Sequence, residues 1–333
     1  MIGGPLVRNR LSKLRDHEWS ALERAVVIAS LAIVLGALFV TSYSLALGDP
    51  VPHDIDAALV GDPSGHERTV EAVQEVGQGS LDFSRYPSVP AALHALAEEE
   101  VYAVLDLTSA RPRLYLASAA GASVARVLEQ ISTVDPSVRV VDAHPLGTHD
   151  PNGVEIFYLM LVATIVGFIT VFQVRAQAAG LRLHHWSAFI VALAVAGSLV
   201  FALVDGPLLD RLDLPVLEAW GILALQLLAV SSFASLMLVL IGRWAIIPTW
   251  LFFVILGNSS SGGAVAPPLL PPPFDFLSQW LPSGATVTAL REAVYFPGHQ
   301  HIHPMAVLAT WATGLFVAMA VVSHWRRSSP GGE

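Results

Sequence analysis

The sequence predicts a polytopic α-helical membrane protein with six transmembrane helices, a small extracytoplasmic α/β domain between helices 1 and 2, and a re-entrant helical element before helix 6. Of its 333 residues, only 14% are charged and 54% are hydrophobic, whereas an average soluble domain has about 25% charged residues. The apolar residues also gather in several uncharged runs. Each is close to the roughly 20 residues that cross a bilayer core of about 30 Å as a helix.

The composition excludes several classes of function. The net charge of −9 argues against a nucleic-acid-binding protein. The chain has no cysteine, so it has no disulfide, no thiolate ligand and no thiol nucleophile. The sequence also lacks Gly-x-x-x-x-Gly-Lys-Ser/Thr, His-Glu-x-x-His and Gly-x-Ser-x-Gly. We therefore expect no catalytic residue and no cofactor, and a chain that is not an enzyme.

The six spans differ in strength. The fifth is the weakest because it is short, contains Pro248 and is completed only by running into a Gly/Ser stretch. A cleaved signal peptide is the alternative for the first span. Its apolar run, however, is longer than the usual 7–15 residues, and a poor cleavage site follows. The predicted spans are residues 25–47, 154–174, 186–204, 217–242, 244–260 and 304–323.

Basic residues predict the orientation in the cell membrane. They gather before the first span, after the last, and in the loops after the second and fourth. The other short loops hold only Arg211 and Arg291. By the positive-inside rule both termini, including the tail 324–333, are cytoplasmic and residues 48–153 lie outside. The basic residues on the predicted inner side are Arg8, Arg10, Lys13, Arg15, Arg24, Arg175, Arg182, Arg243, Arg326 and Arg327.

Residues 1–24 predict a cytoplasmic amphipathic helix on the membrane surface. At about 100° per residue, Val7, Leu11 and Leu14 fall on one face, and Arg15 flanks it. A disordered basic tail is the alternative.

Residues 48–153 predict a small domain with its own core. The segment has sixteen acidic residues and six arginines, a net charge of −10. The triplet Glu98–Glu100 raises the question of a calcium site, but no oxygen-rich loop accompanies it, so a solvated helix end is favoured. The pattern predicts strands at 55–60, 101–107, 113–118 and 138–142, and helices at 64–76, 87–99 and 119–133.

The predicted re-entrant element, residues 261–303, is too apolar for a solvated loop and too rich in proline for a single span. Two short helices in the outer leaflet fit it, covered by protein or by an aqueous cavity. The preceding Gly/Ser run suggests backbone freedom rather than phosphate binding. Arg291 and Glu292 either pair near a translocation path or face water. Candidate residues of this path or element are Gly257, Ser261, Gly262, Gly263, Pro271, Pro282, Arg291 and Glu292.

Three alternating histidines, His299, His301 and His303, are weak candidates for a metal site. In a strand this spacing points all three the same way, which suits zinc or copper. An ordinary interfacial loop leading into the last span is the favoured interpretation, so we predict no metal.

Several motifs carry a resemblance to a known family. They are His149-Asp-Pro-Asn-Gly153 before the second span, Leu256–Gly263 with Pro271, Trp280-Leu-Pro282, Leu290-Arg291, and Ala91–Leu96 followed by Val101–Leu105. In this order around the spans, they resemble the type-2 ABC transporter permeases, in the branch that includes the phage-infection-protein (Pip) family.

The resemblance implies a homodimeric permease energised by a separate ABC ATP-binding subunit. That subunit would dock on the cytoplasmic face, at the lead-in helix and the 175–185 loop. The residues implied for this contact are Leu11, Leu14, Arg15, Arg175 and Arg182.

Three functional hypotheses follow. The first is an exporter permease that moves an amphipathic substrate, such as a lipid or drug, outward. The second is a non-transporting envelope scaffold or receptor, Pip-like, that acts through its outer domain. The third is a membrane metalloenzyme built on the three histidines. An ion-coupled carrier has little to work with, since few ionisable groups lie within the spans.

Overall fold

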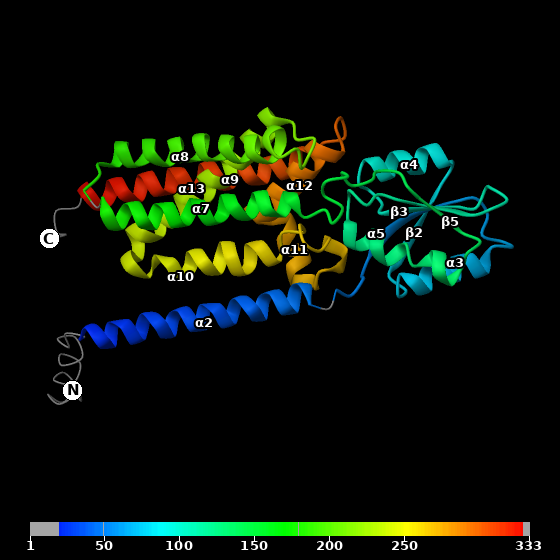
Figure 1. Cartoon of the computed structure of the whole chain (residues 1–333), viewed down its shortest axis with the longest axis horizontal. Helices are drawn as coiled ribbons and strands as arrows, with labels where there is room; N and C mark the ends of the chain where they lie inside the picture. The colour runs from blue at the N-terminus through cyan, green and yellow to red at the C-terminus, as the bar shows by residue number, and fades with distance from the viewer. Residues whose placement is uncertain (1–19, 49, 179, 329–333) are drawn as a thin grey trace, which may run out of the picture. The chain divides into compact units, whose positions relative to one another are not determined.

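The computed structural model describes residues 20–48, 50–178 and 180–328 (Figure 1). The chain divides into two compact units, Met1–Thr41 and Ser42–Glu333. Helix α2 (Ala21–Leu47) begins at a capping box. The Ser20 backbone N–H donates to the Glu23 carboxylate at 2.7 Å, and the Glu23 N–H donates to Ser20 Oγ at 3.2 Å. Residues 21–24 therefore belong to this helix. The remainder of the predicted lead-in helix, residues 1–19, lies outside the described residues.

The second unit contains the last residues of α2, from Ser42, and a five-stranded mixed sheet of strand order β2-β1-β3-β4-β5. Strand β1 is parallel to both β2 and β3, β3 is antiparallel to β4, and β4 is parallel to β5. The antiparallel β3–β4 pair is formed across the short connection 107–112. The strands are β1 (Ile55–Val60), β2 (Leu81–Tyr86), β3 (Ala103–Asp106), β4 (Arg113–Leu116) and β5 (Arg139–Asp142).

Helices cover both faces of this sheet because its central strands are apolar on both sides. In β1, Ile55, Ala57 and Leu59 face one hydrophobic core, and Ala58 and Val60 face the other, as the period of two requires. Helices α3 (Glu67–Val76), α5 (Ala122–Leu128) and α6 (Ile131–Val134) contribute to the first core. Helix α4 (Val89–Ala97) contributes to the second, and Figure 1 shows it on the opposite side of the sheet.

Two details of this region differ from the prediction. Strand β2 was not predicted, because only the first residue of its Leu-Asp-Phe-Ser-Arg-Tyr sequence is buried. An edge strand of this kind has a weak hydrophobic pattern. The predicted helix 119–133 is two short helices, because α5 ends at Leu128 and α6 begins at Ile131.

Within the described residues, five helical stretches are long and apolar enough to cross a membrane. The fourth, Val216–Gly257, has 42 residues and includes the predicted fourth span and most of the predicted fifth. A straight helix of that length would measure about 63 Å, about twice the hydrocarbon thickness. The other four stretches are Ala25–Leu47, Glu155–Gln177, Leu183–Leu208 and Ile302–Arg326.

The long fourth stretch is interrupted at Gly242, where φ is +59°. Helix α9 (Val216–Ile241) ends there. A 3-10 turn (η2, Gly242–Ala245), the single turn α10 (Ile246–Thr249) and a π-helical segment (η3, Trp250–Gly257) follow. The positive φ explains why glycine occupies the break. Six crossings therefore stay a prediction, with the fifth assigned to η2, α10 and η3.

The bundle has one hydrophobic core, formed by α7 (Glu155–Gln177), α8 (Leu183–Leu203), α9, α12 (Pro282–Tyr295) and α13 (Ile302–Ser328). A π-turn, η1 (Val204–Leu208), extends α8. Helices α7 and α9 approach closely at Gly167, where a Cβ would lie 3.0 Å from Val230 Cγ1. Ala163, one turn earlier, is fully buried. This small-x-x-x-small pair is typical of membrane helix contacts.

Helix α7 starts at the Asp-Pro-Asn-Gly motif. The Asp150 carboxylate accepts the backbone N–H groups of Val154 at 3.0 Å and Glu155 at 3.1 Å. Gly153 has a φ of +67°, a conformation that favours glycine. The motif thus forms the turn that leads into α7 and caps the exposed donors at its first turn.

Candidate functional site

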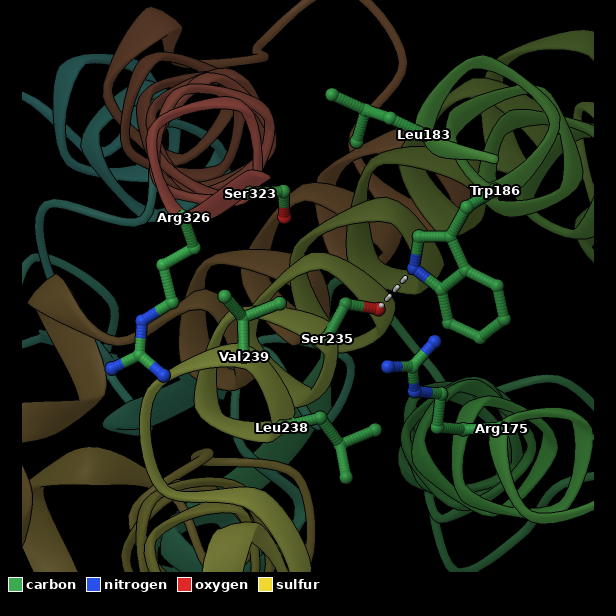
Figure 2. Close-up of a pocket in the computed structure, with 8 residues that line it drawn as sticks. All are labelled: Arg175, Leu183, Trp186, Ser235, Leu238, Val239, Ser323 and Arg326. Atoms are coloured by element: carbon green, nitrogen blue, oxygen red, sulfur yellow. Dashed lines mark hydrogen bonds between the residues drawn. The ribbon is translucent and has the colours of Figure 1, made fainter. Parts of the chain in front are cut away.

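A cavity of about 230 Å³ lies between α7, α8, α9 and α13, and it is the candidate functional site (Figure 2). Arg175 and Arg326 stand on opposite sides of it, with Ser235 between them. Trp186 Nε1–H donates to Ser235 Oγ at 3.2 Å, which fixes the indole against the cavity wall. The lining residues are Arg175, Leu183, Trp186, Ser235, Leu238, Val239, Ser323 and Arg326.

The described residues that line this cavity include two arginines and no acidic residue. The Arg326 guanidinium donates to the Leu240 carbonyl at 3.1 Å, near the end of α9, where the helix dipole favours a cation. The sequence has no Asp or Glu in 156–204, 219–274 or 293–332, the stretches that supply the cavity walls. Leu183, Leu238 and Val239 add an apolar part to the lining. The arrangement suits a ligand with an anionic group and an apolar portion.

The residues implied for an ATPase contact lie in different places. Arg175 lines the cavity. Arg182 is the exposed residue immediately before α8. Leu11, Leu14 and Arg15 lie outside the described residues. The docking face therefore stays a prediction. Arg175 is the one residue of this set that also lines the cavity.

The glycines of the Gly/Ser run lie where close packing or the backbone conformation favours glycine. Gly262 has a φ of +73°, in the left-handed region. A Cβ on Gly257 would lie 2.7 Å from Ser283 Oγ, and one on Gly263 would lie 2.9 Å from Phe157 Cβ. Ser261 is buried, and its hydroxyl donates to the Asn258 carbonyl at 2.9 Å. Gly262 thus has a conformation that favours glycine, whereas Gly257 and Gly263 allow close packing; the predicted backbone freedom of the run stays a prediction.

The two prolines of the candidate set start helices. A 3-10 turn, η4 (Pro267–Leu269), precedes Pro271, the residue before α11 (Pro272–Trp280). Pro282 is the first residue of α12, where a missing N–H costs nothing. The two short helices predicted for this element are present. Most of α12 is buried in the bundle core, so it is covered by protein; the depth of the element in a membrane stays a prediction.

Arg291 and Glu292 bond to different partners. Arg291 Nη2 donates to the Gly262 carbonyl at 2.7 Å and so holds the left-handed turn. Glu292 is only 3% exposed. Its carboxylate accepts the His301 backbone N–H at 3.0 Å and lies 3.1 Å from His301 Nδ1. The expectation that the two residues either pair or both face water is therefore wrong, because Glu292 is buried against the loop before α13.

A second carboxyl group lies beside Glu292. Glu99 belongs to the Glu98–Glu100 triplet, and burial raises its pKa to about 7, with the charge of Glu292 adding to the rise and Arg291 and His301 opposing it. Glu99 also has a φ of +54°, which is unusual for a residue with a side chain. The triplet is therefore more than a solvated helix end.

The three alternating histidines do not converge on one point. His299 Nδ1 lies 2.6 Å from Glu98 Oε1, whereas His301 meets Glu292. His303 Nε2 lies 3.3 Å from the Gln279 carbonyl, and its ring meets Trp280 edge-on. The period-two expectation fails because these residues occupy a loop and the start of α13 rather than a strand.

Of the eight residues that line the cavity, only Arg175 was predicted as a site residue. The missed residues include Trp186, Ser235, Ser323 and Arg326. Arg326 entered only the count of inner charges. The other three have no motif, and only the packing of four helices brings them together. A serine inside an apolar span is the single signal that marks Ser235 and Ser323.

No protein-family model, curated protein or solved structure matches this chain. The family resemblance drawn from the motifs therefore stays a prediction. The fold is that of a protein with several helices long and apolar enough to cross a membrane and with a small mixed sheet.

Proposed function

We propose that the chain is the membrane-embedded permease subunit of an ABC-type exporter, which moves an amphipathic substrate outward and is energised by a separate ATPase. The observation that carries the proposal is the arginine-lined cavity within the helix bundle. Arg175 and Arg326 are exposed near the ends of α7 and α13, where their charges can attract the anionic head group of an amphipathic molecule.

The cavity also supports a class of substrate. Its volume of about 230 Å³ is below the about 300–1,000 Å³ of pockets that enclose drug-sized ligands. It therefore suits the polar head of an amphipathic molecule, with the apolar tail left among the helices. Arg175 and Arg326 favour a head group with negative charge.

The remaining features of the proposal are the orientation, the sixth crossing, the dimer and the partner. Single-cysteine labelling tests the first two cleanly because the natural chain has no cysteine. We expect Ser132→Cys and Gln300→Cys to react with an impermeant maleimide in intact cells. Gly180→Cys and Arg243→Cys should react only after permeabilisation. Labelling of Arg243→Cys and Gln300→Cys from the same side would contradict the sixth crossing.

Purification into nanodiscs tests the partner. A P-loop ATPase recovered in equal amount with two copies of this chain is the expected result. Recovery of the chain alone, without any ATPase, would contradict the permease function.

The cavity is tested on that complex with matched variants. We expect nanodiscs of phosphatidylglycerol to raise ATP turnover above that in phosphatidylcholine, and Arg175→Gln with Arg326→Gln to remove the difference. Arg243→Gln is the control, because Arg243 lies over the Trp244 ring at 5.3 Å and is not part of the cavity lining. A loss of the difference in the control, or its persistence in the double variant, would show that the cavity does not select the head group.

One observation favours the alternative, a non-transporting envelope scaffold or receptor. The α/β region has hydrophobic cores on both faces of its sheet, and its segment carries a charge of −10 from sixteen acidic and six basic residues. Such a region suits a basic partner outside the membrane. Recovery of envelope proteins with the chain, and of no ATPase, would favour this alternative. This recovery should be lost when residues 50–153 are exchanged for an unrelated domain.

A further inference from the structure

Three side chains that can bind a metal lie together where α4 meets the loop before α13. His94 and Glu98 are four residues apart, so they lie on the same side of the helix end. His94 Nε2 is 3.7 Å from Glu98 Oε1. His299 approaches from 201 positions along the chain, with its Nδ1 at 2.6 Å from that oxygen. The two imidazole rings lie 5.7 Å apart between centroids.

We infer that His94, Glu98 and His299 form a zinc site. Their ligand atoms all lie within 4.8 Å of one another. In a tetrahedral zinc site, with bonds of about 2.0–2.1 Å, the ligand atoms are about 3.3 Å apart. The distances from Glu98 Oε1 to His94 Nε2, 3.7 Å, and to His299 Nδ1, 2.6 Å, lie on either side of that value. Rotation of these side chains would bring the three ligand atoms to the spacing of a zinc site.

The donor set favours a transition-metal ion such as Zn²⁺ over Ca²⁺ or Mg²⁺. Two imidazoles and one carboxylate suit Zn²⁺, and the same set leaves the fourth position of a tetrahedral site for water. Ca²⁺ and Mg²⁺ prefer oxygen ligands throughout. The side chains are accessible to an entering ion, since His94 is 68% exposed and Glu98 and His299 are 29% and 31% exposed. The net charge of −10 in residues 48–153, sixteen acidic against six basic, attracts cations to this surface.

The position of the site gives it a structural role. His94 lies in α4, the helix that covers one face of the sheet, and Glu98 is its C-cap residue, whereas His299 lies between α12 and α13 of the bundle. A bound ion would join these two regions through three coordinate bonds. Phe296 supports the same junction, because it is fully buried in the hydrophobic core that α4 forms with the sheet. A zinc ion bound here would link the α/β region to the helix bundle.

A neighbouring cluster makes the assignment testable. Glu99, Glu292 and His301 also bring three ligand atoms within 4.8 Å of one another. Its two carboxylates and buried Glu292 distinguish it from the more accessible His94 cluster. His303, the third of the alternating histidines, bonds the Gln279 carbonyl and lies outside both clusters.

The experiment is a zinc titration of the purified full-length chain in detergent, after removal of metals with EDTA. We expect one Zn²⁺ per chain, with affinity reduced at least about 100-fold in His299→Ala and in Glu98→Gln, since changes outside the ligand shell alone cost about 10–100-fold. His303→Ala and His301→Ala should bind like the natural chain. Zinc should also raise the melting temperature of the natural chain and of both controls, but not of the two ligand variants.

Three outcomes would overturn the inference. The first is no zinc binding by the natural chain, which would leave an ordinary His–Glu ion pair. The second is unchanged binding in both His299→Ala and Glu98→Gln. The third is loss of binding in His301→Ala with retention in His299→Ala, which would move the ion to the Glu99 cluster. Circular dichroism and gel filtration identify a variant that fails to fold, and Glu98→Gln, which keeps the side-chain size, then gives the result.

Discussion

Gln226 connects three helices in the centre of the bundle, and replacing it tests how the bundle is held together. Its Nε2–H donates to Thr164 Oγ1 of α7 at 3.0 Å, and its Oε1 accepts the Thr286 hydroxyl of α12 at 3.1 Å. All three side chains are completely buried. Gln226→Leu removes both hydrogen bonds and keeps nearly the same volume, whereas Gln226→Ala also leaves a cavity.

The magnitudes follow from these contacts. A hydrogen bond between membrane helices contributes about 0.6 kcal/mol on average and up to about 1.7. The two bonds of Gln226 therefore contribute about 1–3 kcal/mol. Loss of roughly 60 Å³ of side chain in Gln226→Ala adds about 1.5 kcal/mol, at roughly 24 cal/mol per Å³ of cavity. The hydroxyl of Thr286 keeps a second acceptor, the Pro282 carbonyl at 2.8 Å, so no orphaned-donor cost is added there.

The assay is unfolding by sodium dodecyl sulfate in mixed micelles, followed by fluorescence of the eight tryptophans. We expect Gln226→Ala to be less stable than Gln226→Leu, and both to be less stable than the natural chain. Gln173→Leu, at an exposed position of α7, is the matched control and should change stability by less than about 0.5 kcal/mol. A double-mutant cycle with Thr286→Val should give a coupling of about 0.5–1.5 kcal/mol. No coupling, together with a Gln226→Leu variant as stable as the natural chain, would refute the network.

Two further predictions concern the helix junctions. Gly284→Ala places a Cβ 1.9 Å from the Ser278 carbonyl oxygen, so we expect a loss of more than about 3 kcal/mol in thermal unfolding. Gly314→Ala, which meets nothing within 4 Å, should be neutral or stabilising, and equal effects would contradict the contact. Glu155→Gln removes the ion pair with Arg211, whose Nη2 lies 2.8 Å from Glu155 Oε1. We expect a loss of about 0.5–1 kcal/mol that shrinks at high salt, and an effect independent of salt would argue against the pair.

The local sequence pattern predicted the elements that have many buried apolar residues and recognisable capping residues at their ends. Strand β1 has the predicted range, Ile55–Val60, because it is apolar on both faces. Helix α4 lies within the predicted 87–99, since Ser88 caps its first turn and Pro90 favours that position. Strand β2 could not be identified in the same way, because its position in the sheet comes from backbone pairing with β1 and its side chains show no strong hydrophobic pattern.

The site depends on contacts that the sequence order does not contain. The lining of the cavity comes from four helices, and its two arginines are 151 positions apart in numbering, at 175 and 326. His299 illustrates the same limit, since its partner Glu98 lies 201 positions away. Spacing within one segment suggested that three histidines act together. The fold instead gives each histidine a partner from a different element, and only the three-dimensional arrangement separates them.

The segment between α10 and α13 explains how the α/β region and the bundle act on each other. Ala266 and Leu269 enter one core of the sheet, and Phe296 enters the other, while α12 between them packs in the bundle core. The Ala266 N–H donates to Ser123 Oγ of α5 at 2.9 Å. A shift of α12 would therefore pull on both faces of the sheet, and packed cores resist small displacements until they rearrange as a unit. A rearrangement of the bundle, such as the proposed permease function would require, would then reach the α/β region through these anchors.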